Sequence, residues 1–288
     1  MHTRLGQGGK LTVSPSLEPC SRQAPARRQP REPSPRENGR PHMSVFPESP
    51  TCLRLARNTL GRDFVVGDVH GHFELLDAFM STVGFDTTRD RLLAVGDLID
   101  RGPGSHQVLE WLQRPWFYSV RGNHEQMILD HDLGTGSVEK HRNNGGAWYH
   151  DAAAELRQEI ATQLAQLPFA IEVETASGRF GVVHAEPPLL PGQHHWEEIL
   201  MNLAGEQGGD VQQLTQRQVL YSRSRINNRD RTPITGVDAV YVGHTSVPAP
   251  VRYGNVVYLD TGCSWADGHL SAINVASGEV ISTQYGAA

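Results

Sequence analysis

The sequence predicts an α/β fold (α+β by some schemes) whose core is a sandwich of two β-sheets flanked by helices. Three observations support this prediction. Short apolar runs alternate with amphipathic stretches in the first half of the chain, apolar runs of strand length return in the second half, and polar, glycine-containing loops follow runs in both halves. Alternating strand and helix signals indicate parallel strands joined by helices that cover the sheet faces.

The first half contains three predicted strands, at 64–66, 92–95 and 117–120, with a helix after each of the first two. Apolar residues at helical spacing predict these two helices. They are Phe73, Leu75, Leu76, Phe79 and Val83 in the first helix, and Val108, Leu109 and Leu112 in the second. Ligands of such sheets bind beyond the carboxyl ends of the strands. We therefore expect functional residues in the loops that follow the strands.

The second half begins with a mostly helical stretch over 126–168, with a break at 143–149 and a helix over 152–167. Strands then return, and the sequence predicts them at 170–174, 179–185, 239–245, 256–262 and 270–275. Segment 186–235 is polar and loop-rich, with weak helical periodicity at 199–203 and 211–220. We expect the early and the late strands to form the two sheets.

Residues 1–50 are rich in Pro, Arg and Ser and contain almost nothing apolar to bury, so the sequence predicts a disordered basic tail there. Residues 51–288 form the predicted catalytic domain. The tail is interpreted either as a basic docking arm or as a dispensable extension, with Met43 as an alternative start of translation.

Charge and cysteine content exclude several classes of protein. Residues 1–43 carry eight Lys or Arg and three Glu, a net +5, so the chain's charge of −6 leaves −11 on the remainder. An acidic domain binds phosphate backbones poorly, and we expect no nucleic-acid partner. Cys20, Cys52 and Cys263 are scattered, and no apolar run reaches the roughly 18 residues of a membrane span. We expect a cytoplasmic protein without a membrane partner; the sequence does not predict its oligomeric state.

Side chains with metal-binding chemistry stand at the predicted strand ends. Asp68 and His70 follow the first strand, and because alternate residues of extended chain project to the same side, both can reach one cation. Each of the next two strands ends in glycine followed by Asp or Asn, a repetition that turn chemistry alone does not explain. Oxygen ligands mixed with imidazoles, without cysteine, suit Mn, Fe or Zn. The candidate ligands are Asp68, His70, Asp97, Asn123, His184 and His244.

Five motifs occur in a fixed order: GDVHG (67–71), GDLIDRG (96–102), RGNHE (121–125), VHAE (183–186) and GHT (243–245). Together they resemble the PPP-type metallophosphoesterase superfamily, and most of all its bacterial and phage serine/threonine protein phosphatases of the lambda type. NNGGAW (143–148) and Tyr221-Ser222-Arg223 are similar to further segments of that subgroup. The resemblance covers about residues 62–278 and implies a calcineurin-like metallophosphoesterase fold.

The resemblance also implies a role for each matching residue. Two divalent metal ions are implied, Mn²⁺ first, with Fe or Zn as alternatives. One ion would be held by Asp68, His70 and Asp97, and the other by Asp97, Asn123, His184 and His244. The general acid would be His124, oriented by Asp100, and the phosphoryl oxygens would be bound by Arg101 and Arg223. Arg121 is either a third phosphate-binding residue or part of a structural ion pair.

The chemistry of phosphoester hydrolysis explains these residue types. Two cations about 3.5–4 Å apart can acidify a shared water and clamp the oxygens of an in-line displacement. The implied reaction is direct attack on phosphorus by the resulting hydroxide. Guanidinium groups match phosphate oxygens and share the developing charge, and an imidazolium can protonate the departing alkoxide. We expect a phosphoprotein, or a phosphorylated small molecule, as the substrate.

Two other functions stay open. RGPGS (101–105) also continues the second motif of symmetrical dinucleoside tetraphosphate hydrolases, which share this scaffold. A non-catalytic scaffold that binds partners is disfavoured, because every ligand and the acid are present. We interpret the remaining histidines in helices and loops as surface or structural residues: His72, His106, His131, His141, His150 and His269.

Overall fold

The structure is a computed structural model that describes residues 50–188 and 194–284. Nearly all of the predicted tail lies outside the described residues, so its disorder and the domain boundary stay predictions. No helix in the described ranges is long and apolar enough to cross a membrane.

Successive residues of the central strands face two different hydrophobic layers, which explains why their sequences are continuously apolar. In β2 (Asp63–Val66), Phe64 and Val66 pack under helices, whereas Val65 packs against the opposite sheet. β7 (Ala239–Val242) alternates in the same way between its own helices and the space between the sheets. The fold therefore has three apolar layers, one between the sheets and one under each helical cover.

The strands form two sheets, as the sequence predicts, but the late strand β10 pairs with the early strand β2 and not with the other late strands. Sheet A has the order β1-β5-β6-β7-β9-β8, and sheet B has the order β11-β10-β2-β3-β4. β2, β3 and β4 are parallel to one another, and so are β6, β7 and β9, so each sheet presents several carboxyl ends at one edge. The other strands are β1 (Cys52–Leu55), β3 (Arg91–Ala94), β4 (Phe117–Ser119), β5 (Ala170–Glu174), β6 (Arg179–Val183), β8 (Val251–Tyr253), β9 (Val256–Tyr258), β10 (Leu270–Asn274) and β11 (Val280–Thr283).

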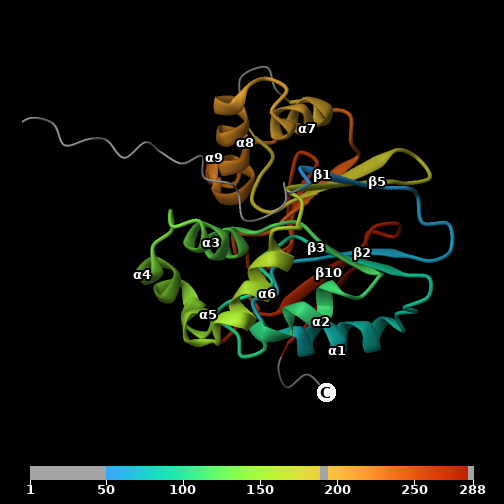
Figure 1. The fold of residues 1–288 in the computed structure, drawn as a ribbon. Helices are drawn as coiled ribbons and strands as arrows, with labels where there is room; N and C mark the ends of the chain where they lie inside the picture. Colours follow the sequence, from blue (N-terminus) through green and yellow to red (C-terminus); the bar gives the residue numbers. More distant parts are fainter. Residues whose placement is uncertain (1–49, 189–193, 285–288) are drawn as a thin grey trace, which may run out of the picture. The chain divides into compact units, whose positions relative to one another are not determined.

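Helices cover the outer face of each sheet (Figure 1). Sheet B is covered by α1 (Phe73–Val83), α2 (Val108–Leu112) and α6 (Ala154–Leu164), and sheet A by α7 (Trp196–Ala204) and α8 (Gly209–Tyr221). The remaining helical segments are α3 (Asn123–Asp132), α4 (Val138–His141), α5 (Ala147–Asp151), α9 (Ser224–Asn228), the 3₁₀ turn η1 (Ser105–Gln107) and the π-type turn η2 (Arg142–Gly146).

The structure differs from the sequence prediction in two further respects. β1, β8 and β11 are additional strands; each lies at the edge of its sheet and is partly exposed, so it lacks the apolar run that marks a buried strand. Segment 186–235 is also more helical than predicted. In α7, Trp196, Ile199 and Leu203 are buried against sheet A, although polar residues elsewhere in the segment weaken the apolar periodicity.

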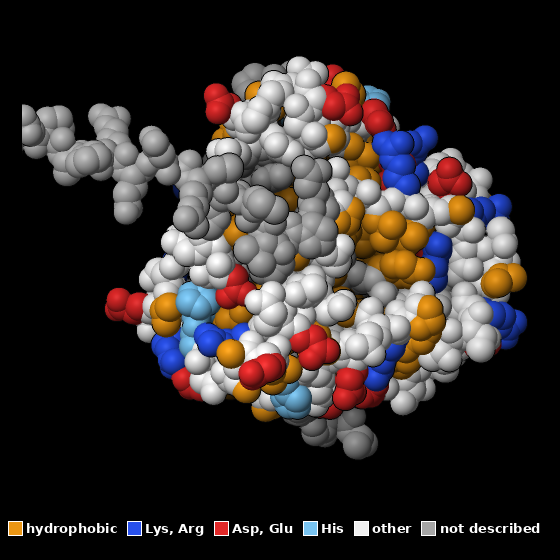
Figure 2. Space-filling model, in the orientation of Figure 1, with side chains coloured by type: hydrophobic (Ala, Val, Ile, Leu, Met, Phe, Trp, Pro, Cys, Tyr) orange, Lys and Arg blue, Asp and Glu red, His pale blue; other side chains and the backbone are white. Residues whose placement is uncertain are grey.

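The two sheets leave an opening between the amino ends of their parallel strands, at the edge opposite the strand-end motifs. A cavity of about 750 Å³ lies there, and its lining includes Phe180, Tyr241 and Val257 from sheet A and Ile273 from sheet B. Figure 2 shows hydrophobic side chains gathered in this hollow with basic side chains beside them. The carboxyl ends of the strands, by contrast, are filled by polar side chains.

Gly181 of β6 gives a test of the packing between sheet A and α7. A Cβ atom at this position would lie 2.4 Å from the Trp196 ring, which is buried and held by an indole N–H bond to Glu172. We predict that Gly181→Ala lowers the free energy of unfolding by about 1–3 kcal/mol through overpacking. Gly209→Ala is the matched control, because open space surrounds Gly209. Urea unfolding measures both, and equal stability of the two variants would contradict this packing.

Candidate metal centre

Strands from both sheets end at the same place and carry the predicted metal ligands. Asp68 and His70 follow β2, Asp97 follows β3, Asn123 begins α3, His184 follows β6 and His244 follows β7. Loops from both sheets therefore meet in one small volume. The sequence separates these residues widely, and only the sandwich brings them together.

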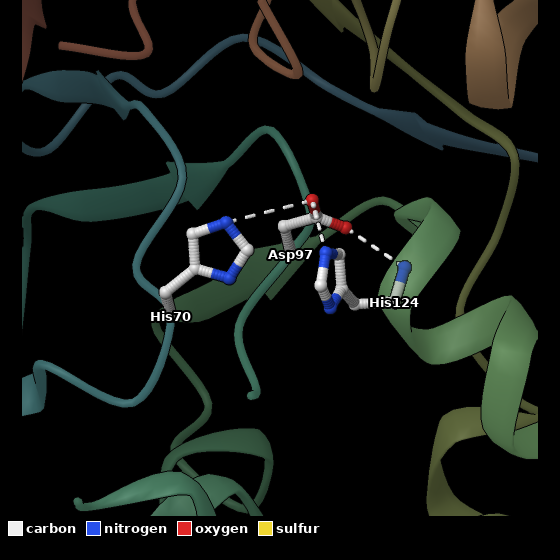
Figure 3. A group of neighbouring side chains, drawn as sticks. All are labelled: His70, Asp97 and His124. Atoms are coloured by element: carbon white, nitrogen blue, oxygen red, sulfur yellow. Dashed lines mark hydrogen bonds and ion pairs between the residues drawn. The ribbon is translucent and has the colours of Figure 1, made fainter. Parts of the chain in front are cut away.

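Asp97 joins two groups of side chains that are each close enough to hold a metal ion. Among the described residues, ligand atoms of Asp97, His70 and His124 lie within 4.8 Å of one another, and so do those of Asp97, His184 and His244. Figure 3 shows a ring nitrogen of His70 and one of His124 directed toward the same oxygen of the Asp97 carboxylate. The Asp97 Oδ2 atom lies 3.7 Å from His70 Nε2, and Oδ1 lies 3.4 Å from His184 Nε2.

The hydrogen bonds of His70 and His184 show which ring nitrogen faces the centre as an acceptor. The Nδ1 of His70 lies 2.9 Å from the carbonyl of Ile99, and that of His184 lies 2.8 Å from the carbonyl of Val95, so each Nδ1 carries the hydrogen. Burial lowers the pKa of His70 to about 3 and lowers the pKa of His184. Both rings are therefore neutral, with the Nε2 lone pair turned toward Asp97.

The carboxylates of the centre are buried close to one another. Burial raises the pKa of Asp68 well above its usual range, and the charges of Asp260 and Asp97 raise it further. Burial alone would also raise the pKa of Asp97, but the imidazoles around it, His184 first, outweigh that effect and lower the pKa. Buried carboxylates at this spacing need positive charge nearby to be ionised together.

Three observations show that these residues fit divalent metal ions. The Nε2 atom of His244 is shielded from solvent and has no hydrogen-bond partner among the described residues. The bare Nε2 of His184 lies 3.0 Å from the Oδ1 of Asn123, so two acceptors face each other without a hydrogen between them. Burial lowers the pKa of His244 to about 3, which leaves its lone pair free. Unpartnered acceptors around a common point are what a cation satisfies.

The loops of the centre are held in unusual backbone conformations. Among the described residues, six non-glycine residues have positive φ, and five belong to this site: His70, Asp97, Asp100, Arg101 and His244. The Glu125 carboxylate fixes the Asp97 loop, because it accepts hydrogen bonds from the backbone N–H groups of Asp97, Leu98 and Gly122 at 2.7–3.0 Å. Backbone strain at one site persists only when its surroundings hold it.

His124 and Asp100 form the buried pair that the sequence predicts. The His124 Nδ1–H donates to Asp100 Oδ2 at 2.6 Å. Burial acts to lower the pKa of His124, but the charge of Asp97 and the hydrogen bond to Asp100 outweigh it, so the pKa is raised. These contacts favour the charged form of His124, whose Nε2 is directed toward the centre.

Arg101 and Arg223 are exposed cations at the mouth of the centre. Arg101 donates to His70 Nε2 at 2.7 Å, and its guanidinium lies 3.3 Å from His124 Nε2 and 5.2 Å from the ring of the exposed Trp265. Arg223 donates to the carbonyl of His244 at 3.2 Å. The Nε2 lone pair of His70 cannot serve both Arg101 and a metal ion, so the two would compete for it.

Arg121 is placed differently from the other two arginines. Its buried guanidinium donates to Gln126 and to the carbonyls of Ala165 and Leu167, and it lies 4.8 Å from the Phe169 ring. Burial lowers the pKa of Arg121 to about 10. These contacts join α3 to the chain before β5, so its substrate-binding role stays a prediction with less support than those of Arg101 and Arg223.

Several residues of the centre carry no role in the sequence analysis. Glu125 lies inside RGNHE and Trp148 inside NNGGAW. A motif does not reveal, however, that its side chains form hydrogen bonds with residues far away in the sequence. Asp260 follows β9 and is buried beside Asp68; the predicted strand over 256–262 included this residue, and a carboxylate near the end of an apolar run was an available signal. His141, interpreted as a surface or structural residue, is fully buried and donates to Asp100. Nothing in its spacing distinguishes it from the other histidines.

Comparison with known proteins agrees with this geometry. Residues 64–248 match the family described as Calcineurin-like phosphoesterase. The chain is 36% identical to serine/threonine-protein phosphatase 1 of Salmonella typhimurium over 202 residues, which cover 69% of this chain and 85% of that protein. A symmetrical bis(5'-nucleosyl)-tetraphosphatase of Cellvibrio japonicus is 40% identical over 70 residues, 24% of each chain. A solved candidate diadenosine tetraphosphatase has a TM-score of 0.54 and 25% identity, covering 81% of this chain and 97% of that chain.

Metal analysis tests the shared role of Asp97. Because both groups of ligands include this carboxylate, we predict that Asp97→Ala loses both ions, whereas His244→Ala loses about one of the two expected ions. Metal content is measured after equilibration with Mn²⁺ and gel filtration. Asp210→Ala, at an exposed carboxylate of α8, is the control and should keep both. Retention of two ions by Asp97→Ala would contradict the shared-ligand assignment.

Proposed function

The chain belongs to the calcineurin-like phosphoesterase family, and from this premise we propose that it is a serine/threonine protein phosphatase. The observation that carries the proposal is the buried His124–Asp100 pair beside the metal centre. A charged imidazole suits a leaving group that needs a proton, and the alkoxide of serine or threonine is such a group. The phosphatase relative, which aligns over most of its length, supports the same substrate class.

The residues that would hold the metal ions are part of the proposal. We assign Asp68, His70 and Asp97 to one ion, and Asp97, Asn123, His184 and His244 to the other. When bound, the ions would supply positive charge and acidify a water molecule to the point where it ionises near neutral pH. Mn²⁺ is the first choice, with Fe or Zn as alternatives, because oxygen and imidazole donors suit all three.

The remaining residues bind and orient the phosphoryl group. Arg101 and Arg223 bring two guanidinium groups to the mouth of the centre, where they can bind phosphoryl oxygens and share charge in the transition state. Glu186 anchors the second of them, since its carboxylate accepts from Ser222 Oγ and from the backbone of Arg225 on either side of Arg223. His124 donates its Nε2 proton to the departing oxygen, and Asp100 keeps the ring in place.

The setting of the reaction follows from the same residues. The substrate is proposed to be a phosphoprotein, and the net negative charge outside the tail argues against a nucleic-acid partner. A reducing cytoplasm is the proposed compartment, in keeping with the free thiols of Cys52 and Cys263.

Symmetrical dinucleoside tetraphosphate hydrolysis is the second candidate function. RGPGS (101–105) supports it, and so does the Cellvibrio japonicus relative. That likeness is confined to about a quarter of each chain, however, whereas the protein phosphatase relative aligns over 69% of this chain. The protein phosphatase is therefore the stronger proposal.

A comparison of two substrates separates the two candidate functions directly. With Mn²⁺ added, kcat/KM for a phosphoserine peptide should exceed that for diadenosine tetraphosphate, and a chelator should abolish both activities. Steady-state kinetics on the two substrates under identical conditions provide the measurement. Faster hydrolysis of the tetraphosphate would favour the second candidate, and full activity in the presence of chelator would rule out the metal-dependent mechanism.

A further prediction concerns the role of His124 as the general acid. Protonation matters most when the departing oxygen is a strong base, so His124→Asn should slow hydrolysis of a phosphoserine peptide by about 10²–10⁴-fold and p-nitrophenyl phosphate far less. Metal content should not change, because the proposed ligands of the first ion are Asp68, His70 and Asp97 and do not include His124. His106→Asn, at an exposed histidine in η1, should leave both rates unchanged. Equal losses on the two substrates would mean that His124 acts in binding and not as an acid.

A further inference from the structure

The Asp100 carboxylate accepts hydrogen bonds from three side chains, and only one of them is His124. Its Oδ2 accepts from His124 Nδ1 at 2.6 Å and from His141 Nε2 at 2.9 Å, while its Oδ1 accepts from Trp148 Nε1 at 2.8 Å. Asp100 and His141 are both fully buried. Burial acts to raise the pKa of Asp100, but the bonds from His124 and His141 outweigh it and lower the pKa.

The hydrogen bonds of His141 involve both ring nitrogens. An ionised carboxylate only accepts hydrogen bonds, so the Nε2 of His141 must carry a hydrogen. The Nδ1 of His141 lies 3.0 Å from the Nε2 of His150. Burial, followed by the charge of His141, lowers the pKa of His150 to about 4. A chain of hydrogen bonds thus joins His150, His141 and Asp100.

The packing around His141 leaves the ring no alternative position. A Cβ atom on Gly146 would lie 2.1 Å from the His141 ring, and the ring of His150 lies 4.9 Å away. The π-type turn η2 holds this arrangement, with Gly145 in a positive-φ conformation against the backbone of Arg101. The NNGGAW segment therefore places His141 and Trp148 on the two oxygens of one carboxylate.

We propose that His141 is a positioning residue that fixes the plane of the Asp100 carboxylate and, through it, the ring of His124. The proposal rests on the proposed function, because it concerns the residue that protonates the leaving group. A carboxylate held at one oxygen can rotate about its last side-chain torsion. With His141 on Oδ2 and Trp148 on Oδ1, that rotation is blocked, and His124 keeps its Nε2 directed at the phosphate-binding Arg101, 3.3 Å away.

Two substitutions of nearly equal volume separate this role from simple packing. His141→Leu removes the hydrogen-bond donor, whereas His141→Gln keeps an N–H group that can reach Asp100. We expect His141→Leu to lower kcat for a phosphoserine peptide by about 10-fold or more, with KM and metal content unchanged and p-nitrophenyl phosphate nearly unaffected. His141→Gln should recover most of the lost kcat.

Proton NMR provides a readout that does not depend on turnover. The His124 Nδ1–H in its 2.6 Å bond should give a far-downfield resonance, which His124→Asn identifies by removing it. In protein free of paramagnetic metal, this resonance should shift or broaden in His141→Leu and return in His141→Gln. If wild-type protein hydrolyses neither ester, the proposed function fails, and the resonance still decides whether His141 positions His124.

The outcomes are distinct. An unchanged resonance in His141→Leu, or equal kcat losses on the two esters that His141→Gln does not recover, would overturn the positioning role. If His141→Leu gives no cooperative melting transition, His150→Phe takes its place, because it leaves His141 present and removes the hydrogen-bond partner of its Nδ1. A smaller shift of the same resonance in His150→Phe then supports the proposal, and no shift overturns it.

Discussion

Asp97 directs one carboxylate oxygen toward His184 and the other toward His70 and His124, so a single buried side chain joins the two halves of the metal centre. A carboxylate removed from water is stable only when hydrogen bonds or positive charge compensate for the lost hydration. The backbone N–H of His124 donates to Asp97 at 3.0 Å, and cations held between Asp97 and the surrounding imidazoles would supply the positive charge. Those partners come from three loops on two sheets, so the position of one carboxylate depends on the packing of the whole sandwich.

The rigid frame also explains how strained loops persist at this edge. Positive φ at His70, Asp97, Asp100, Arg101 and His244 turns their side chains inward from loops that would otherwise relax. Close backbone approach contributes as well: a Cβ atom on Gly122 would lie 2.2 Å from the Asp97 carboxylate, and one on Gly243 would lie 1.9 Å from that of Asp68. The glycines in the motifs thus reflect space needed by the ligands beside them.

Much of this architecture could be predicted from the sequence, because the central strands and strand-end motifs carry local signals. Val65 belongs to an apolar run that can be recognised without knowing which strand pairs with it. Asp97 follows the glycine at the end of the next apolar run. Edge strands such as β11 could not be predicted in the same way, since an exposed strand has no apolar run. His141 escaped prediction for a different reason. Its importance lies in a contact with Asp100, 41 residues away, and pairwise contacts of that kind leave no pattern in one sequence.

The wide separation of the ligands along the chain has a consequence for how the protein matures. The Asp68 carboxylate accepts from the backbone N–H of His244, which lies 176 residues later, and His184 meets Asn123 across 61 residues. Contacts this distant form only after long loops have closed, late in folding. A chain with one sheet formed cannot assemble both groups of ligands. The capacity to load both ions is consequently a report on completed folding, because a chain in which only one sheet has formed lacks ligands of the second ion.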